Sequence, residues 1–174
     1  MADENVNGAA SPEQAAGPQF AVQKIYVKDV SFESPGAPEV FSQPANPDIS
    51  MNLNQRVNPI ADGAYEVVLK VTITCAEGDK TLYLAEVEQA GIFALSGFES
   101  AQLEGMLGSY CPNMLYPYAR QTISNLVQDG GFPPFLLQPL NFDAIYAEQM
   151  RRRVEEHGMA TSDNLGFSPP VGNA

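Results

Sequence analysis

Residues 67–84, VVLKVTITCAEGDKTLYL, have the pattern of a strand, a turn and the start of a second strand. Apolar residues alternate with polar ones through the first half, which is the period of a β-strand with one buried face. The apolar set is Val67, Leu69, Val71, Ile73 and Cys75. Residues 77–80, EGDK, then have the composition of a tight turn. The stretch predicts a β-hairpin whose second strand runs antiparallel to the first, from Thr81 to Leu95.

Two further strands are predicted upstream of this hairpin. The first runs from Phe20 to Phe32, and simple alternation places residues 25 and 27 on the same face as residues 29, 31 and 33. The second runs from Ile49 to Val57 and has one apolar face. Prolines at residues 34–38 and 44–47 leave an irregular crossing segment between the two strands. Residues 58–63 are expected to form the next turn.

Helical periods begin only after Gly97. The pattern predicts a short helix that Gly108 ends, and a second from Pro112 to about Gln128, kinked by Pro117. A last helix is expected to start near Asn141 or Asp143 and to stop at Gly158. Strands followed by helices predict an α+β fold, with a four-stranded antiparallel sheet and helices packed on one face.

Length and composition predict one globular domain with two tails. The chain has 174 residues, of which 44% are hydrophobic and 17% charged. Few large apolar residues occur in 1–19 and 158–174, so we expect disordered tails around a folded domain at 20–157. The first nineteen residues lack the basic and apolar regions of a secretory signal, which predicts a cytoplasmic protein. No apolar run is long enough for membrane insertion.

The net charge and the absent sequence motifs argue against several classes of function. The net charge of −12 argues against nucleic acid as a partner and favours a basic one. His157 is the only histidine, and one histidine with two distant cysteines does not fit a zinc site. We expect Cys75 and Cys111 to be reduced core thiols, with a redox or disulfide role as the alternative. Phosphate-binding loops, nucleophile motifs and calcium loops are absent from the sequence. These observations disfavour an enzyme and predict no catalytic residue and no metal site.

Apolar residues exceed what one small sheet can cover. Strands two and three, the long helix and the last helix each have an apolar face, which indicates oligomerisation or surface kept for partners. Aromatic residues and methionines near the crossing segment or the last helix suit adaptable binding. The alternative is that they are ordinary core. These residues are Phe32, Phe41, Ile49, Met51, Leu53, Tyr146 and Met150.

Five segments resemble a known family in the same order. They are KIYVKDVSFESP (24–35), YEVVLKVT (65–72), EQAGIF (88–93), YCPNMLYPYAR (110–120) and PLNFDA (139–144). They resemble SecB, the family of bacterial protein-export chaperones, over about residues 20–154. The resemblance implies an ATP-independent cytosolic holdase, a homotetramer built as a dimer of dimers. It implies no catalysis and no cofactor. Such a protein keeps secretory precursors unfolded and delivers them to the SecA translocation ATPase.

The resemblance also implies two binding surfaces. SecA would dock on Asp29, Glu33, Leu84 and Glu86, and the docking tail of SecA in this family is basic. The seven apolar residues named above would line a client groove between the crossing segment and the last helix. Two departures stand out: residues 42–47 lack the Trp of some members, and Ala90 replaces a common Gly. The alternative function is an oligomeric scaffold or small-molecule-binding protein whose apolar faces are all used in self-association.

Overall fold

The predicted hairpin forms the centre of the fold. The computed structural model describes residues 17–42 and 46–162, and side chains as far as residue 155. Strand β3 (Ala64–Glu77) pairs antiparallel with β4 (Lys80–Ser96) around a turn at Gly78, which has a φ of 58°. Glycine suits this turn because a φ in this range is strained for other residues. The alternating apolar set of β3, from Val67 to Cys75, is buried as predicted.

Two edge strands complete a four-stranded antiparallel sheet. Strand β1 (Gln19–Glu33) pairs with β4, and β2 (Asp48–Ala61) pairs with β3, which gives the order β1-β4-β3-β2. The turn expected over residues 58–63 is shorter than predicted, because β2 continues through Pro59 to Ala61. Proline is tolerated there because β2 is an edge strand.

A β-bulge in β1 corrects the predicted alternation. The bulge lies between Val27 and Asp29 and inserts Lys28 as an extra residue. Val27 is opposite Gln89, whereas Asp29 is opposite Glu88, the neighbouring residue of β4. Successive residues of a strand point to opposite faces, so the bulge reverses the side chains that follow it. The expectation that residues 25 and 27 share a face with residues 29, 31 and 33 is therefore wrong.

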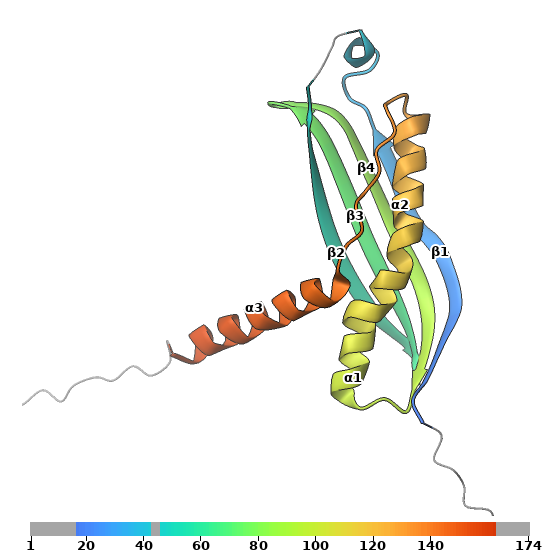
Figure 1. The fold of residues 1–174 in the computed structure, drawn as a ribbon, viewed down its shortest axis with the longest axis vertical. Helices are drawn as coiled ribbons and strands as arrows, with labels where there is room; N and C mark the ends of the chain where they lie inside the picture. Colours follow the sequence, from blue (N-terminus) through green and yellow to red (C-terminus); the bar gives the residue numbers. More distant parts are fainter. Residues whose placement is uncertain (1–16, 43–45, 163–174) are drawn as a thin grey trace, which may run out of the picture.

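One long helical segment covers a single face of the sheet. Helix α1 (Ser100–Gly105) continues through a π-helical turn (Met106–Tyr110) into α2 (Cys111–Asp129). The sequence predicts that Gly108 ends a helix, but Gly108 lies inside the π-helical turn and the helical segment continues past it. Pro117 lies within α2. Helix α2 packs mainly on β4 and β3 (Figure 1). We call the face under α2 the inner face and the opposite one the outer face.

After α2 the chain returns along the sheet to a projecting helix. The segment after α2 runs back beside it to α3 (Phe142–Ser162), which points away from the sheet (Figure 1). Asn141 caps α3, since its side-chain oxygen accepts a hydrogen bond from the Ala144 amide at 3.0 Å. Helix α3 extends past Gly158, where the sequence predicted its end. Residues 1–16 and 163–174 of the expected tails lie outside the described residues.

The fold confirms the predicted α+β class, and the core lies between α2 and the inner face. Leu115, Ala119 and Ile123 of α2 pack in one cluster with the apolar residues of β3 and β4. Cys75 and Cys111 are free thiols buried in this core, and burial raises the pKa of Cys111 to about 12. In the described part of the chain, no helix is long and apolar enough to cross a membrane.

Candidate functional site

A row of apolar side chains on β2 is left uncovered on the inner face. Residues 49, 51, 53 and 57 of β2 lie opposite residues 75, 73, 71 and 67 of β3, which are core residues. Because α2 packs mainly on β4 and β3, this row is not buried. Ile49 and Met51 are each 41% exposed, and Val57 is 38% exposed. The sheet thus has an apolar strip beside its helix.

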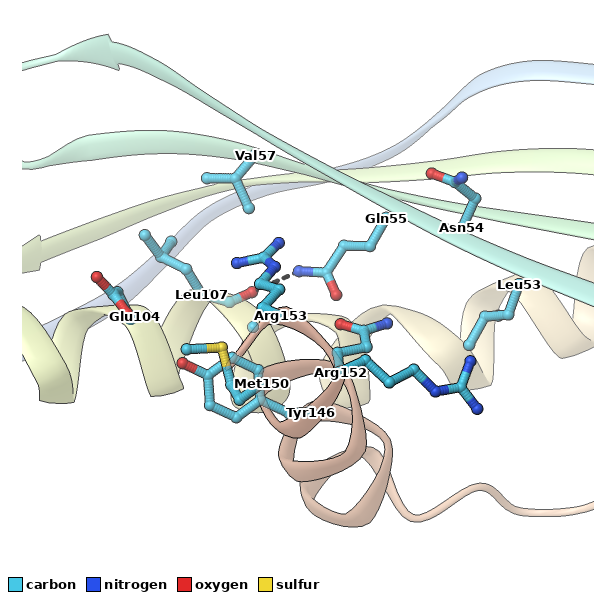
Figure 2. Close-up of a pocket in the computed structure, with 12 residues that line it drawn as sticks. Leu53, Asn54, Gln55, Val57, Glu104, Leu107, Tyr146, Met150, Arg152 and Arg153 are labelled. Carbon is cyan, nitrogen blue, oxygen red and sulfur yellow. Dashed lines mark hydrogen bonds between the residues drawn. The ribbon is translucent and has the colours of Figure 1, made fainter. Parts of the chain in front are cut away.

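The strip opens into a pocket under the first turns of α3 (Figure 2). The pocket has a volume of about 670 Å³ and lies between β2, the π-helical turn and α3. Its apolar lining consists of Leu53, Val57, Leu107, Tyr146 and Met150. Figure 2 shows Tyr146 and Met150 on the side of α3 that faces the helical segment containing Leu107. The rest of the lining is mainly polar and includes Glu104, Arg152 and Arg153, so the pocket can accept apolar side chains together with polar groups of a partner.

Helix α3 is held beside this pocket by contacts with the π-helical turn. A Cβ atom on Gly108 would lie 2.4 Å from the ring of Tyr146, so only glycine lets the ring pack there. The Ser109 hydroxyl donates a hydrogen bond to the Asp143 carboxylate. From the other wall, Gln55 Nε2 donates to the Leu107 carbonyl at 2.7 Å. Gly108 therefore permits the docking of α3 instead of stopping a helix.

An aromatic cluster lies beneath the crossing segment. Phe32, Phe41 and Tyr83 all contact Phe132, with ring centroids 6.2, 5.2 and 4.7 Å from it. A Cβ atom on Gly130 would lie 2.2 Å from the ring of Phe32, so this corner is closely packed. Phe41 is nevertheless 53% exposed. This part of the expected groove is largely filled by the chain itself.

The structure divides the seven predicted client residues into three groups. Leu53, Tyr146 and Met150 line the pocket. Phe32 and Phe41 meet in the aromatic cluster, and Ile49 and Met51 lie on the inner face of β2. Sequence reasoning missed Phe132 as the centre of the cluster. It also missed the other lining residues of the pocket, which are Asn54, Gln55, Val57, Glu104, Leu107, Gly108, Gln149, Arg152 and Arg153. Of these residues, Val57 could have been identified from the sequence, because it lies on the same apolar face of the predicted strand as Leu53.

The four predicted SecA-docking residues are neighbours on the outer face. Glu33 is opposite Leu84 in the β1–β4 pairing, and Asp29 is opposite Glu88, next to Glu86 on the same face of β4. Asp29 and Glu33 are exposed, and within the described residues their carboxylates have no hydrogen bond or ion pair. The bulge in β1 is what places both on this face. The result is an acidic patch on the outer face of the sheet.

Ion pairs between strands cover the centre of the outer face. Lys28 of β1 binds Glu66 of β3 at 2.7 Å, and Arg56 of β2 binds Glu88 of β4 at 2.8 Å. Each pair passes over the strand between its partners, and Val68 and Ala90 of these strands are only 1% and 0% exposed. Long charged side chains can bury apolar surface in this way.

Glu66 is the most strongly bonded of these carboxylates. It accepts hydrogen bonds from Lys28, from the Tyr26 hydroxyl and from Asn58 Nδ2. These bonds lower the pKa of Glu66 to about 2. The hydrogen bond between Tyr26 and Glu66 also raises the pKa of Tyr26 to about 12. Glu66 is therefore ionised in the folded protein at neutral pH.

Comparison with known proteins agrees with this architecture. The family model described as "Preprotein translocase subunit SecB" matches residues 13–153. The SecB-like chaperone Rv1957 of Mycobacterium tuberculosis, solved with a ChAD peptide from the HigA1 antitoxin, has a similar fold. Its TM-score is 0.58 at 16% identity, over 70% of this chain and 90% of that one.

Curated relatives match the chain over its whole length. The proteins named "Protein-export protein SecB" from Xanthomonas euvesicatoria and Stenotrophomonas maltophilia are each 54% identical to it over 175 residues. The protein of that name from Xylella fastidiosa is 50% identical over 177 residues. In each case the match covers 100% of both chains. The chain belongs to the SecB family of protein-export chaperones.

Proposed function

We propose that this chain is an ATP-independent cytosolic holdase that keeps secretory precursors unfolded and delivers them to SecA. The observation that carries the proposal is the separation of two unlike surfaces on one sheet. The inner face of β2 has an exposed apolar strip and a pocket, and the outer face has an acidic patch. Two partners of different chemistry can therefore bind at once. The activity is binding and release, with no catalysed reaction and no cofactor.

The apolar strip and the pocket form the proposed client groove. A precursor that has not folded exposes apolar side chains, and their burial contributes about 25 cal/mol per Å². The ordering of a flexible chain opposes this gain, so only long apolar contacts hold a client. The strip runs along β2 through Ile49, Met51 and Leu53 into the pocket beside Tyr146. Such a groove selects slowly folding chains over particular sequences.

The acidic patch forms the proposed SecA-docking site. Asp29, Glu33, Leu84 and Glu86 together offer three carboxylates around one apolar side chain. This combination is complementary to a basic segment that also carries apolar atoms. Electrostatic complementarity speeds encounter and excludes acidic competitors, and it weakens as the salt concentration rises.

We also propose that the working form is a homotetramer, a dimer of dimers. The second edge strand, β1, has an apolar row of its own that α2 does not bury. Val22, Val27 and Val30 are 38%, 46% and 44% exposed in the single chain. Such a row on an edge strand favours association with another copy. Light scattering at micromolar concentration should give the tetramer mass, and a monomer mass would contradict the proposal.

The experiment for the whole proposal is a refolding assay with purified full-length protein. An unfolded precursor is diluted into buffer with and without the chaperone, and recovery of its native fluorescence is followed. We expect the chaperone to delay refolding without ATP, and purified SecA to bind the same preparation. Undelayed refolding would reject the holdase, and absence of SecA binding would reject the delivery step.

A further inference from the structure

Glu86 differs from the other carboxylates of the acidic patch because both of its oxygens are already bound within the chain. Lys70 Nζ lies 2.7 Å from Glu86 Oε1, and the Thr72 hydroxyl donates to Glu86 Oε2 at 2.8 Å. Thr72 is directly opposite Glu86 in the β3–β4 pairing, so this contact follows from the register. These contacts lower the pKa of Glu86 and raise that of Lys70.

The contact with Lys70 does not follow from the register. Lys70 is directly opposite Glu88, not Glu86. Glu88 is bound instead by both Nη atoms of Arg56, at 2.8 and 3.2 Å. Lys70 therefore reaches diagonally along the outer face to Glu86, a distance that long side chains can span. Arg56 holds Glu88 and leaves Lys70 to Glu86.

The carboxylates of the acidic patch are therefore not equally available to a cationic partner. The carboxylates of Asp29 and Glu33 are unoccupied within the described residues, whereas Glu86 already has a cation beside it. The side chain of Lys70 is 36% exposed and that of Glu86 is 23% exposed, so solvent and a docking protein can reach both. A second cation at Glu86 would lie close to the Lys70 ammonium, and like charges at short range repel.

We propose that Lys70 sets the strength of SecA docking by competing with the partner's cationic side chain for the Glu86 carboxylate. This inference rests on the docking site proposed above. Docking on Asp29 and Glu33 needs no rearrangement, whereas docking on Glu86 requires Lys70 to move away. Lys70 acts as a specificity-determining residue, because a weakly basic surface cannot displace it.

The test measures the affinity of purified SecA for the full-length protein by calorimetry. Exposed ion pairs are weak, so Lys70→Gln should tighten binding about twofold to fivefold. Lys70→Arg keeps the competing charge and should stay near wild type. The matched control is Lys24→Gln, which removes the same charge from the same face. Lys24 lies opposite Ile92, six positions along β4 from Glu86, or about 20 Å, and salt screens that distance.

The same substitution made in a Glu86→Gln variant tests the proposed contact between Lys70 and Glu86 by itself. In Glu86→Gln the substitution Lys70→Gln should no longer tighten binding, because the contested charge is gone. The inference is wrong if Lys70→Gln leaves the affinity unchanged, if Lys24→Gln tightens binding as much, or if the gain persists in the Glu86→Gln background. If Glu86→Gln alone does not weaken binding, the docking site itself is wrong and the inference fails with it. Thermal melting of each variant checks that the fold is kept.

Discussion

The two faces of the sheet differ in which of their apolar residues are exposed. On the inner face, which has a helix over it, Ile49 and Met51 of β2 are each 41% exposed. On the outer face, which has no described helix packed on it, Val68 and Ala90 are 1% and 0% exposed. Helix α2 reaches mainly two of the four strands, while ion pairs between strands cover the centre of the outer face.

The difference shows how one small domain can offer two unlike binding surfaces. Apolar surface left open by a helix layer that covers mainly two strands suits an unfolded chain, which needs no precise geometry. Charge left over after internal pairing, at Asp29 and Glu33, suits a folded basic partner. Because the sheet lies between them, changes to one surface should leave the other intact. Each of the following predictions either breaks this separation or sharpens it.

The largest effect is expected from Leu53→Ser combined with Met150→Ser, which removes two apolar side chains from the pocket. Losing about 1 kcal/mol at each half-buried contact should weaken client binding about thirtyfold. Binding of a labelled unfolded precursor measures this, and SecA affinity and tetramer mass should not change. Asn52→Ser with Ala147→Ser is the control, since both lie outside the pocket on the same two elements. Dissociation into monomers would show that the residues are core or interface, and unchanged client affinity would remove them from the groove.

A reversal of charge on the outer face should affect only SecA. Glu86→Lys or Asp29→Lys should weaken SecA binding about tenfold, because each replaces an attraction with a repulsion at the docking site. Delay of precursor refolding should remain nearly intact. Asp62→Lys gives the same charge change in the β2–β3 turn, at the far end of the sheet, and should have little effect. Equal loss in all three variants would indicate a net-charge effect and not a site.

The docking of α3 can be tested with two glycines one helical turn apart. Gly108→Ala would force the new Cβ against the Tyr146 ring, so α3 should shift and client affinity should fall about fivefold. Gly105→Ala is the control, because nothing lies within 4 Å of the added Cβ. Fluorescence titration with the labelled precursor compares the two. Equal affinities would show that the position of α3 does not matter for the groove.

The smallest effect concerns stability in acid. The folded-state pKa of Glu66 is lowered to about 2 from an ordinary 4.5, so the ionised form stabilises the fold. This contribution is fully present above pH 4.5 and is lost as the pH falls toward 2. Glu66→Gln should lower the free energy of unfolding by about 1 kcal/mol at pH 7 and should flatten its decline in acid. Urea unfolding at pH 7 and pH 3 measures both, and an unchanged acid decline would contradict the assignment.

Much of the fold could be predicted because its strands have strong period-2 patterns. The hairpin around Gly78 and the cap at Asn141 were both visible in the sequence. The β-bulge was not, because Lys28 is polar and fits either face of an edge strand. Gly108 was read as a helix end, since sequence alone does not show that a ring from another helix needs its space.

The candidate site was predictable only in part, for the same physical reason. Residues such as Leu53, Tyr146 and Met150 showed their apolar character, but which of them meet depends on where α3 docks. The ion pairs of the outer face depend on which long side chain reaches which carboxylate. Lys70 lies opposite Glu88 and yet binds Glu86, while Arg56 on another strand binds Glu88.

The separation of the two surfaces is tested most directly by simultaneous binding. A labelled unfolded precursor is bound to the purified chaperone without ATP, and SecA is then added to saturation while the mass of the labelled complex is followed. The two-surface account predicts one heavier complex that contains precursor, chaperone and SecA, with the precursor retained. Release of the precursor in proportion to the SecA bound would contradict it, because the two partners would then share one surface.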